Sequence, residues 1–101
     1  MRKIYTECPV EYTASLIANK WKILILRDLL TGTKRYNELT KSIVGISAKV
    51  LTENLRQLES DGIVTRKVYP VVPPKVEYSL SEKGISFIPI INAMCDWGKI
   101  N

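Results

Sequence analysis

Five polar or charged residues, spaced for one side of a single helix, carry the chemistry that this sequence could offer to a nucleic acid. Lysine and arginine can donate to guanine O6 and N7 or to a phosphate, glutamate can accept from cytosine N4, and a hydroxyl can bind a phosphate. Side-chain chemistry alone does not choose among these contacts. The residues concerned are Ser47, Lys49, Thr52, Glu53 and Arg56. Together they predict a surface that binds duplex DNA.

The same segment has an apolar side that would hold these residues in place. Leu51, Leu55 and Leu58 follow the i, i+4, i+7 spacing of a helix face that is buried in a core. Ser47 can cap the first turn, and a glycine follows the last one. We therefore expect an amphipathic recognition helix over about Ser47–Asp61, packed on one face and free on the other.

A shorter amphipathic segment lies just upstream. Tyr36, Leu39 and Ile43 share one side at helical spacing, which predicts a supporting helix over Tyr36–Ser42. Gly45 can turn the chain sharply between the two helices. Two helices joined in this way form a helix-turn-helix, in which the N-terminal residues of the second helix lie nearest the base edges.

Two strand-like runs follow the helices. Val64–Tyr69 and Lys75–Leu80 are separated by a tip that contains three prolines in five residues, which predicts an antiparallel hairpin or wing over about Val64–Leu80. The 101 residues, 46% of them hydrophobic, suffice for one modest core. We expect a single domain over residues 1–101, mainly α with a small β-hairpin: a winged helix-turn-helix with about five helices and a two- to three-stranded antiparallel wing.

Most of the positive charge lies in this motif. The formal charge is +5, and eight basic residues stand against four acidic ones between Lys34 and Lys75. Lys34 and Arg35 precede the supporting helix as candidate phosphate clamps, while Lys67 and Lys75 flank the wing. Such a surplus suits a polyanion. A solvated lysine-rich surface is the alternative, and charge alone does not separate the two.

The flanking segments predict packing helices. Pro9 suits the first turn of a helix that runs to about Ala18, and Lys20–Leu30 is apolar on almost every side, as a central buried helix would be. Ser81 can cap a final helix, which Pro89 should kink or split. The apolar positions expected in that helix are Ile85, Ile88, Ile91, Met94 and Trp97.

Further apolar residues exceed what one small core needs. They are Phe87, Ile90 and Ala93 in the final helix. Together with the N-terminal helix they predict a seam for a homodimer. Trp21 and Trp97 could line a pocket for an effector at such a seam. The alternative interpretation is that both side chains are ordinary core residues. We name no small-molecule effector.

Several classes of function are disfavoured by what the sequence omits. It has no histidine, no nucleophile elbow, no phosphate-binding loop and no glycine-rich dinucleotide turn, so we expect no enzyme and no cofactor. Two cysteines cannot complete a zinc site, so no metal is expected.

No apolar run is long enough to span a membrane, and Met1–Glu7 lacks the pattern of a secretory signal. We therefore expect a cytoplasmic protein that is associated with the nucleoid when it is bound to DNA. The remaining rival is a winged-helix module that contacts protein or RNA without specific DNA readout.

Short segments spread along the chain carry a resemblance to a known family. They are Cys8-Pro9-Val10, Lys20-Trp21, Arg35-Tyr36-Asn37-Glu38-Leu39, Gly45-Ile46-Ser47, Lys49, Leu51-Thr52, Leu55-Arg56-Gln57-Leu58-Glu59, Asp61-Gly62, Tyr69-Pro70, Pro73-Pro74, Val76-Glu77-Tyr78-Ser79-Leu80, Gly84 and Cys95-Asp96-Trp97-Gly98. In these segments the chain resembles the HxlR-type bacterial regulators, MarR-like in general architecture, over nearly its whole length. The resemblance implies a homodimeric winged helix-turn-helix transcription factor that dimerises through its N- and C-terminal helices on a pseudo-palindromic operator.

Cys8 occupies the place of an N-terminal cysteine that senses oxidants or electrophiles in some regulators that the chain resembles. A thiol at a helix N-terminus has its thiolate favoured by the unpaired N–H groups and the helix dipole, which raises its reactivity. The alternative is an inert residue packed at the dimer seam. Cys95 is expected to pack in the terminal helix.

Overall fold

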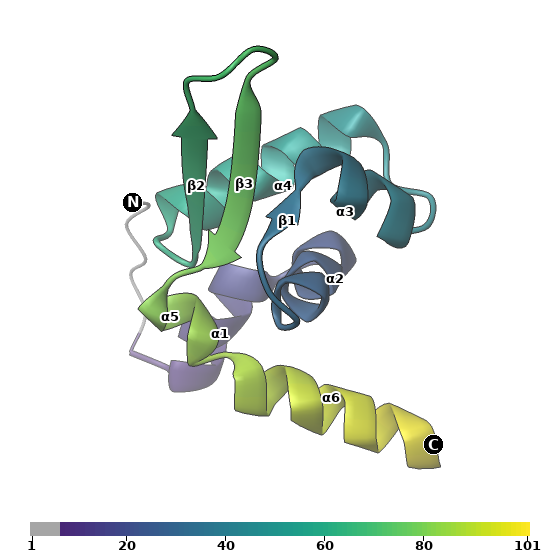
Figure 1. Ribbon diagram of the computed structural model, residues 1–101. Helices are drawn as coiled ribbons and strands as arrows, with labels where there is room; N and C mark the ends of the chain where they lie inside the picture. The colour runs from purple at the N-terminus through teal and green to yellow at the C-terminus, as the bar shows by residue number, and fades with distance from the viewer. Residues whose placement is uncertain (1–6) are drawn as a thin grey trace.

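A computed structural model describes residues 7–101, and most of the N-terminal segment Met1–Glu7 lies outside the described residues. The described chain forms helices and a three-stranded antiparallel sheet with strand order β1-β3-β2. The hairpin rises past the helices at one end, and α6 extends along the other (Figure 1). The elements are α1 (Pro9–Ile17), α2 (Lys20–Leu29), β1 (Lys34–Arg35), α3 (Tyr36–Ser42), α4 (Ala48–Ser60), β2 (Val64–Tyr69), β3 (Lys75–Leu80), α5 (Glu82–Ile85) and α6 (Ile88–Ile100). The mainly α winged helix-turn-helix is therefore confirmed.

The core lies where α2, α3 and α4 meet beneath the sheet. Ile25 and Leu26 of α2 are completely buried, as expected for the central helix. Leu51 and Leu58 of α4 are also completely buried, and Leu39 of α3 joins them. Burying a side chain of this size contributes about 1.5–3 kcal/mol, so the apolar face of α4 fixes the direction of its polar face.

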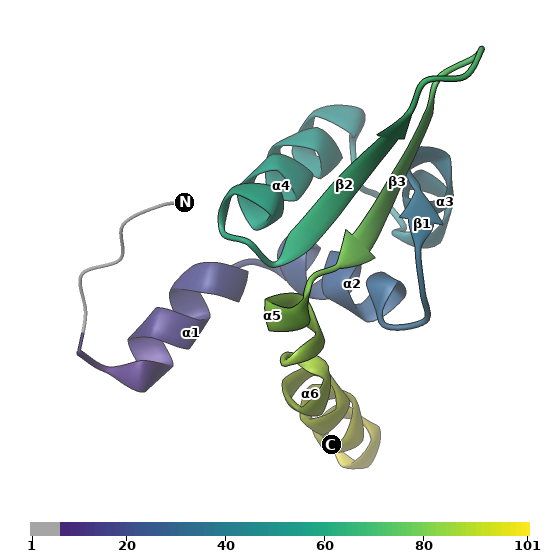
Figure 2. The same ribbon diagram turned by 60° about the vertical axis from the view of Figure 1, so that its left-hand side comes forward.

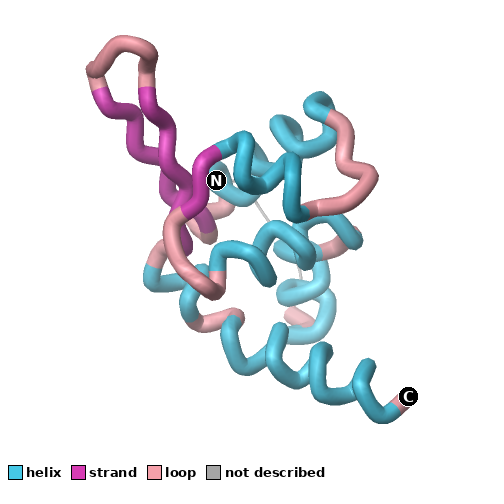
Figure 3. Tube along the Cα trace, turned by 45° about the vertical axis from the view of Figure 1, so that its right-hand side comes forward, coloured by secondary structure: helices cyan, strands magenta, loops and turns pink. Residues whose placement is uncertain are grey.

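The turn between α3 and α4 is built from local signals that the sequence contains. Gly45 has φ of +84°, a left-handed conformation that favours glycine. Ser47 caps α4, because its Oγ accepts a hydrogen bond from the Val50 N–H at 3.1 Å. Tyr36 closes the motif, since its hydroxyl donates to the Ala48 carbonyl oxygen at 3.0 Å. Figure 3 shows this turn as a short loop between two helices.

Polar contacts anchor α4 to α2 as well. Lys22 is only 2% exposed, and its Nζ donates a hydrogen bond to Gln57 Oε1. Asn19 Nδ2 donates to Asn54 Oδ1 at 3.0 Å. A buried lysine is rare in proteins unless it is partnered, and hydrophobic periodicity did not reveal this one. These contacts add directionality to an interface that is otherwise apolar.

The hairpin of β2 and β3 is joined by a third strand, β1, to form the sheet. Both predicted strands have the predicted bounds, and β1 adds a short third strand to β3. Below the hairpin, Gly84 of α5 comes so close to the preceding chain that an added Cβ would lie 2.2 Å from the Ile63 carbonyl oxygen. Ser81 holds this contact, because its backbone N–H donates to the same oxygen at 3.0 Å.

Pro89 splits the C-terminal helix as predicted, with α5 ending at Ile85 and Pro89 lying in the first turn of α6. The predicted environment was correct at Ile91, which is 6% exposed, and wrong at two other residues. Phe87, expected at the surface seam, is 5% exposed and belongs to the core, whereas Trp97 is 68% exposed. The break gives α5 and α6 different orientations (Figure 2), so one helical periodicity cannot describe both. Among residues 7–101, no helix is long and apolar enough to cross a membrane.

Candidate nucleic-acid interface

The polar face of α4 brings the five residues predicted for DNA contact onto one side of the domain. Ser47, Lys49, Glu53 and Arg56 are exposed. Thr52 is half-buried, and its Oγ1 lies 3.2 Å from the Tyr36 hydroxyl. The predicted split of the helix into a packed face and a free face is therefore confirmed.

Three of the four predicted basic residues of the sheet lie on the face directed away from α4, which we call the outer face. Residues paired directly across antiparallel strands point to the same side of a sheet. Arg35 and Lys67 are both paired with Glu77, and Lys75 lies two residues before it on the same strand. The Lys75 Nζ is 3.4 Å from Glu77 Oε2. Lys75 and Lys67 are thus placed beside one carboxylate, and Arg35 is paired with the same residue from β1.

Glu77 is the main correction to the predicted charge of the wing. It follows Lys75 by two residues and so falls just outside the basic stretch counted from the sequence. The Tyr69 hydroxyl donates to Glu77 Oε1 at 2.7 Å. This hydrogen bond, followed by the charges of Lys75 and Lys67, outweighs desolvation and lowers the pKa of Glu77. The carboxylate therefore stays ionised and offsets part of the positive charge of the wing.

Tyr69 orders the lysines on the outer face. The Nζ atoms of Lys67 and Lys75 lie 4.8 Å and 4.9 Å from the centre of its ring. Cation–π contacts at this range hold ammonium groups over an aromatic face while leaving them open to solvent. The two wing lysines are consequently positioned as a pair instead of being two independent surface charges.

The opposite face of the sheet, the inner face, contains two residues that the sequence did not single out. Arg66 and Tyr78 are paired directly across β2 and β3, and Lys34 of β1 is paired with Tyr78 from the other side. Arg66 and Tyr78 border, together with α4, a cavity of about 260 Å³. Its lining residues are Thr52, Leu55, Arg56, Glu59, Arg66 and Tyr78. Strand alternation could have placed Arg66 on this face, but only the register between strands shows what it meets.

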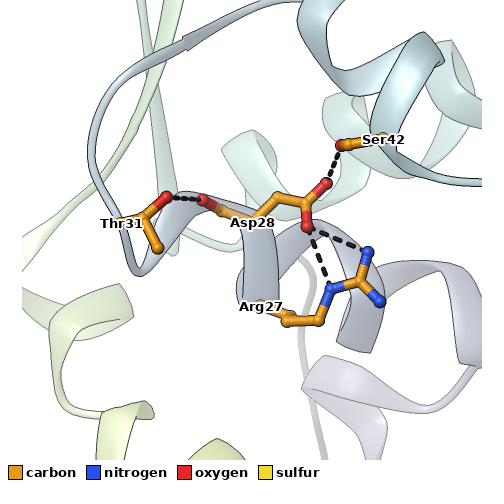
Figure 4. Close-up of polar contacts among 4 residues, drawn as sticks. All are labelled: Arg27, Asp28, Thr31 and Ser42. Atoms are coloured by element: carbon orange, nitrogen blue, oxygen red, sulfur yellow. Dashed lines mark hydrogen bonds and ion pairs between the residues drawn. The ribbon is translucent and has the colours of Figure 1, made fainter.

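A polar cluster fixes α3 against α2 (Figure 4). The Asp28 carboxylate accepts a hydrogen bond from Ser42 Oγ at the end of α3 and from Arg27 Nε at 2.9 Å. The backbone oxygen of Asp28 accepts from Thr31 Oγ1 at 2.9 Å. Because α3 is only seven residues long, such side-chain contacts supplement its limited buried surface.

Exposed apolar side chains cover neighbouring parts of α1 and α6, a surface that we call the α1–α6 face. Ile90, Met94 and Trp97 are 38%, 45% and 68% exposed. With Pro89 and Ala93 they line an open hollow of about 600 Å³. Ile90 also borders a second hollow, whose remaining lining residues are Pro9, Val10, Thr13, Ala14 and Ile17. The two hollows thus share a residue and form one surface.

Both cysteines are exposed, and no disulfide joins them. Cys8 is the residue that precedes the first turn of α1, where it has an extended backbone and makes no side-chain capping hydrogen bond. Pro9 and Val10, which follow it, belong to the α1–α6 face. Within residues 7–101, histidine, cysteine and carboxylate side chains nowhere form a group of three or more that could hold a metal ion.

A helix-turn-helix of α3 and α4, followed by a β-hairpin that lies beside α4, defines a winged helix-turn-helix domain. The family model described as HxlR-like helix-turn-helix matches residues 16–101. The chain belongs to this HxlR-like family.

Relatives and solved structures agree with this assignment. The chain is 50% identical over 93 residues to an HTH-type transcriptional regulator of Methanothermobacter thermautotrophicus, a match that covers 92% of this chain and 71% of the relative. The redox regulator HypR in its oxidised form is 48% identical, with a TM-score of 0.89 and coverage of 93% and 97%. The reduced form of the transcriptional regulator YodB from Bacillus subtilis is 41% identical, with a TM-score of 0.79 and coverage of 91% of both chains.

Proposed function

We propose that this protein regulates transcription by binding a short duplex DNA site in a sequence-specific manner as a homodimer. The observation that carries the proposal is the exposed polar face of α4, with Lys49, Glu53 and Arg56 beside a cationic sheet. Side chains of these types hydrogen-bond to base edges in the major groove, and the cations also bind phosphates. Membership of a family of helix-turn-helix regulators supports the same function.

The α1–α6 face supports dimerisation. It is apolar and exposed, and it lies at the end of the domain opposite the wing tip (Figure 2). A second copy that covers this surface would remove its apolar side chains from water and leave both α4 helices free. A twofold dimer then binds a pseudo-palindromic operator, with half-site centres about 34–36 Å apart or a multiple of that spacing.

Lys49 provides the first test of sequence-specific binding. We expect Lys49→Ala to weaken operator binding by about 1–3 kcal/mol and to relax the preference at one base pair, because Lys49 lies in the first turn of α4 nearest the base edges. Selection of duplexes from a random pool gives the operator, and fluorescence anisotropy then compares each variant on operator and scrambled duplexes.

The matched control is Lys99→Ala, which removes a cation from the last turn of α6. It should bind the operator as the parent protein does. If the parent binds every duplex with equal affinity and salt weakens binding to all of them alike, the proposal of sequence-specific binding is wrong. If it shows no salt-dependent duplex binding at all, the rival module for protein or RNA contacts is favoured.

Cys8 is proposed as an oxidant-responsive residue. Two observations support this role: its exposure beside the α1–α6 face, and the similarity of the chain to the redox regulator HypR. Attack of its thiolate on hydrogen peroxide forms an S–O bond, breaks the O–O bond and releases hydroxide. The resulting sulfenic acid adds a polar group at the edge of the apolar surface. The expected consequence is a shift in how the two protomers pack, and thereby in operator affinity.

The Cys8→Ser variant tests this role. We expect peroxide to change operator affinity of the parent protein by about tenfold or more, and to leave the affinity of Cys8→Ser unchanged, because serine cannot follow the same oxidation chemistry. Cys95→Ser is the matched control and should respond as the parent does. An equal response of parent and Cys8→Ser would show that Cys8 is not the sensor.

A further inference from the structure

We propose that the cavity between α4 and the inner face of the sheet binds one phosphate of the DNA backbone, through the guanidinium groups of Arg56 and Arg66 and the hydroxyl of Tyr78. This inference rests on the proposed function, since it names a contact of the same interface. Arg66 and Tyr78 would then join the DNA-binding residues, although neither belongs to the recognition helix.

The location follows from the shape of duplex DNA. A recognition helix occupies the major groove, and a backbone strand separates that groove from the neighbouring minor groove. In this fold α4 and β2 run side by side (Figure 2). When α4 enters the major groove, the strand at the edge of that groove must pass between α4 and the hairpin. The cavity lies between the same two elements.

The cavity is small and two-sided. It measures about 260 Å³, which suits a phosphate group better than a drug-sized ligand. Thr52, Leu55 and Arg56 contribute the α4 side. Arg66 and Tyr78 contribute the sheet side, and their direct cross-strand pairing keeps the two side chains adjacent. Two cations from different elements therefore meet at one point.

The polar groups at the cavity are suited to donate hydrogen bonds to an oxyanion. Arg66 Nε contacts Glu59 Oε2 at 3.4 Å, and a guanidinium carries four further N–H donors. Burial is the main reason that the pKa of Tyr78 is raised above 10.0, so its hydroxyl keeps its proton at neutral pH. Thr52 lines the cavity but donates its hydroxyl proton to the Tyr36 hydroxyl, 3.2 Å away, because Tyr36 donates its own proton to the Ala48 carbonyl oxygen.

Glu59 is the one anion that lines the cavity, and it gives the proposal its sharpest test. Its carboxylate orients Arg66, but its negative charge opposes a phosphate in the same space. If Glu59 served structure only, its neutralisation would weaken binding or leave it unchanged. If a phosphate enters the cavity, Glu59→Gln should strengthen binding, because glutamine keeps an acceptor for Arg66 and removes the repulsion.

The experiment measures duplex affinity of the full chain as a function of salt concentration, on the selected operator and on a random-sequence duplex. We expect Arg66→Ala to lower the magnitude of the salt slope by about 1 on both duplexes, as the loss of one phosphate contact does. Glu59→Gln should tighten binding by about two- to fivefold, in line with a solvent-exposed charge interaction. Lys99→Ala, the matched control, should keep the parent slope, and thermal unfolding confirms that each variant is folded.

Using both duplexes separates this inference from the proposed function. If the parent prefers no sequence, the proposed function fails, yet a lower slope for Arg66→Ala on the random duplex still supports the phosphate contact. An unchanged slope for Arg66→Ala overturns the inference even when the parent is specific. A titration with inorganic phosphate, followed through the Arg66 Nε–H resonance, adds a third arm: tight saturation together with an unchanged slope would assign the cavity to a free phosphorylated ligand instead.

Discussion

Replacing Met94 with glutamate should convert the proposed dimer into a monomer and weaken operator binding by about 100-fold or more, because the second half-site then contributes no avidity. Met94 lies between Ile90 and Trp97 on the α1–α6 face and is 45% exposed in the single chain. A carboxylate there would have to be buried against the apolar surface of a second copy, at a cost that an unpaired charge cannot recover. Sedimentation measures the oligomeric state, and anisotropy measures operator affinity.

Asn92→Glu is the matched control for this variant. It introduces the same carboxylate two residues away, at an exposed position of α6 that lines neither hollow of the α1–α6 face. This control should remain a dimer and bind the operator. A dimeric Met94→Glu protein with parental affinity would mean that the copies associate through some other surface, and the proposed arrangement of two α4 helices would have to be abandoned.

Replacing Gly84 with alanine should produce the largest loss of stability, about 3 kcal/mol, with a fall in Tm of about 12 °C or more. The added Cβ would lie 2.2 Å from the Ile63 carbonyl oxygen and 3.1 Å from Leu80 Cδ2. The oxygen belongs to the backbone and is already held by the Ser81 N–H, so it cannot move aside alone. Thermal unfolding at a fixed protein concentration measures the effect, since the proposed dimerisation would make Tm depend on concentration.

Gly98→Ala distinguishes crowding from a general effect of alanine. An added Cβ at Gly98 meets nothing within 4 Å, and alanine favours a helix over glycine by up to about 1 kcal/mol. We therefore expect Gly98→Ala to be as stable as the parent or slightly more stable. Equal stability of Gly84→Ala and Gly98→Ala would contradict the close contact between Gly84 of α5 and the Ile63 carbonyl oxygen.

Local signals predicted much of the fold from the sequence. The bounds of the two wing strands were correct because prolines interrupt the chain between them and a glycine precedes the first. The start of α4 was correct because Ser47 can cap only a helix that begins just after it. The five candidate contact residues near or within α4 followed from its strong apolar periodicity, which determines the free face as directly as the buried one.

Features that depend on contacts between distant segments could not be predicted in this way. The change of direction at Pro89 reversed the expected environments of Phe87 and Trp97. Pairing across the sheet placed Arg66 beside Tyr78. The partial neutralisation of the wing by Glu77 depends on the same register, because the hydrogen bond from Tyr69 bridges two strands. No spacing within one segment contains that information.

The polar contacts between α2 and α4 bear on how such regulators diversify. Gln57 and Asn54 hold α4 to Lys22 and Asn19 from the packed side, so these contacts do not involve the outward Lys49 and Glu53. Substituting Lys49 or Glu53 therefore changes the hydrogen-bonding groups that face a DNA target and leaves the packing of α4 on the domain unchanged. Gene duplication followed by a few outward substitutions can generate regulators with separate targets on one scaffold, and the same positions are where an engineer would recode this protein.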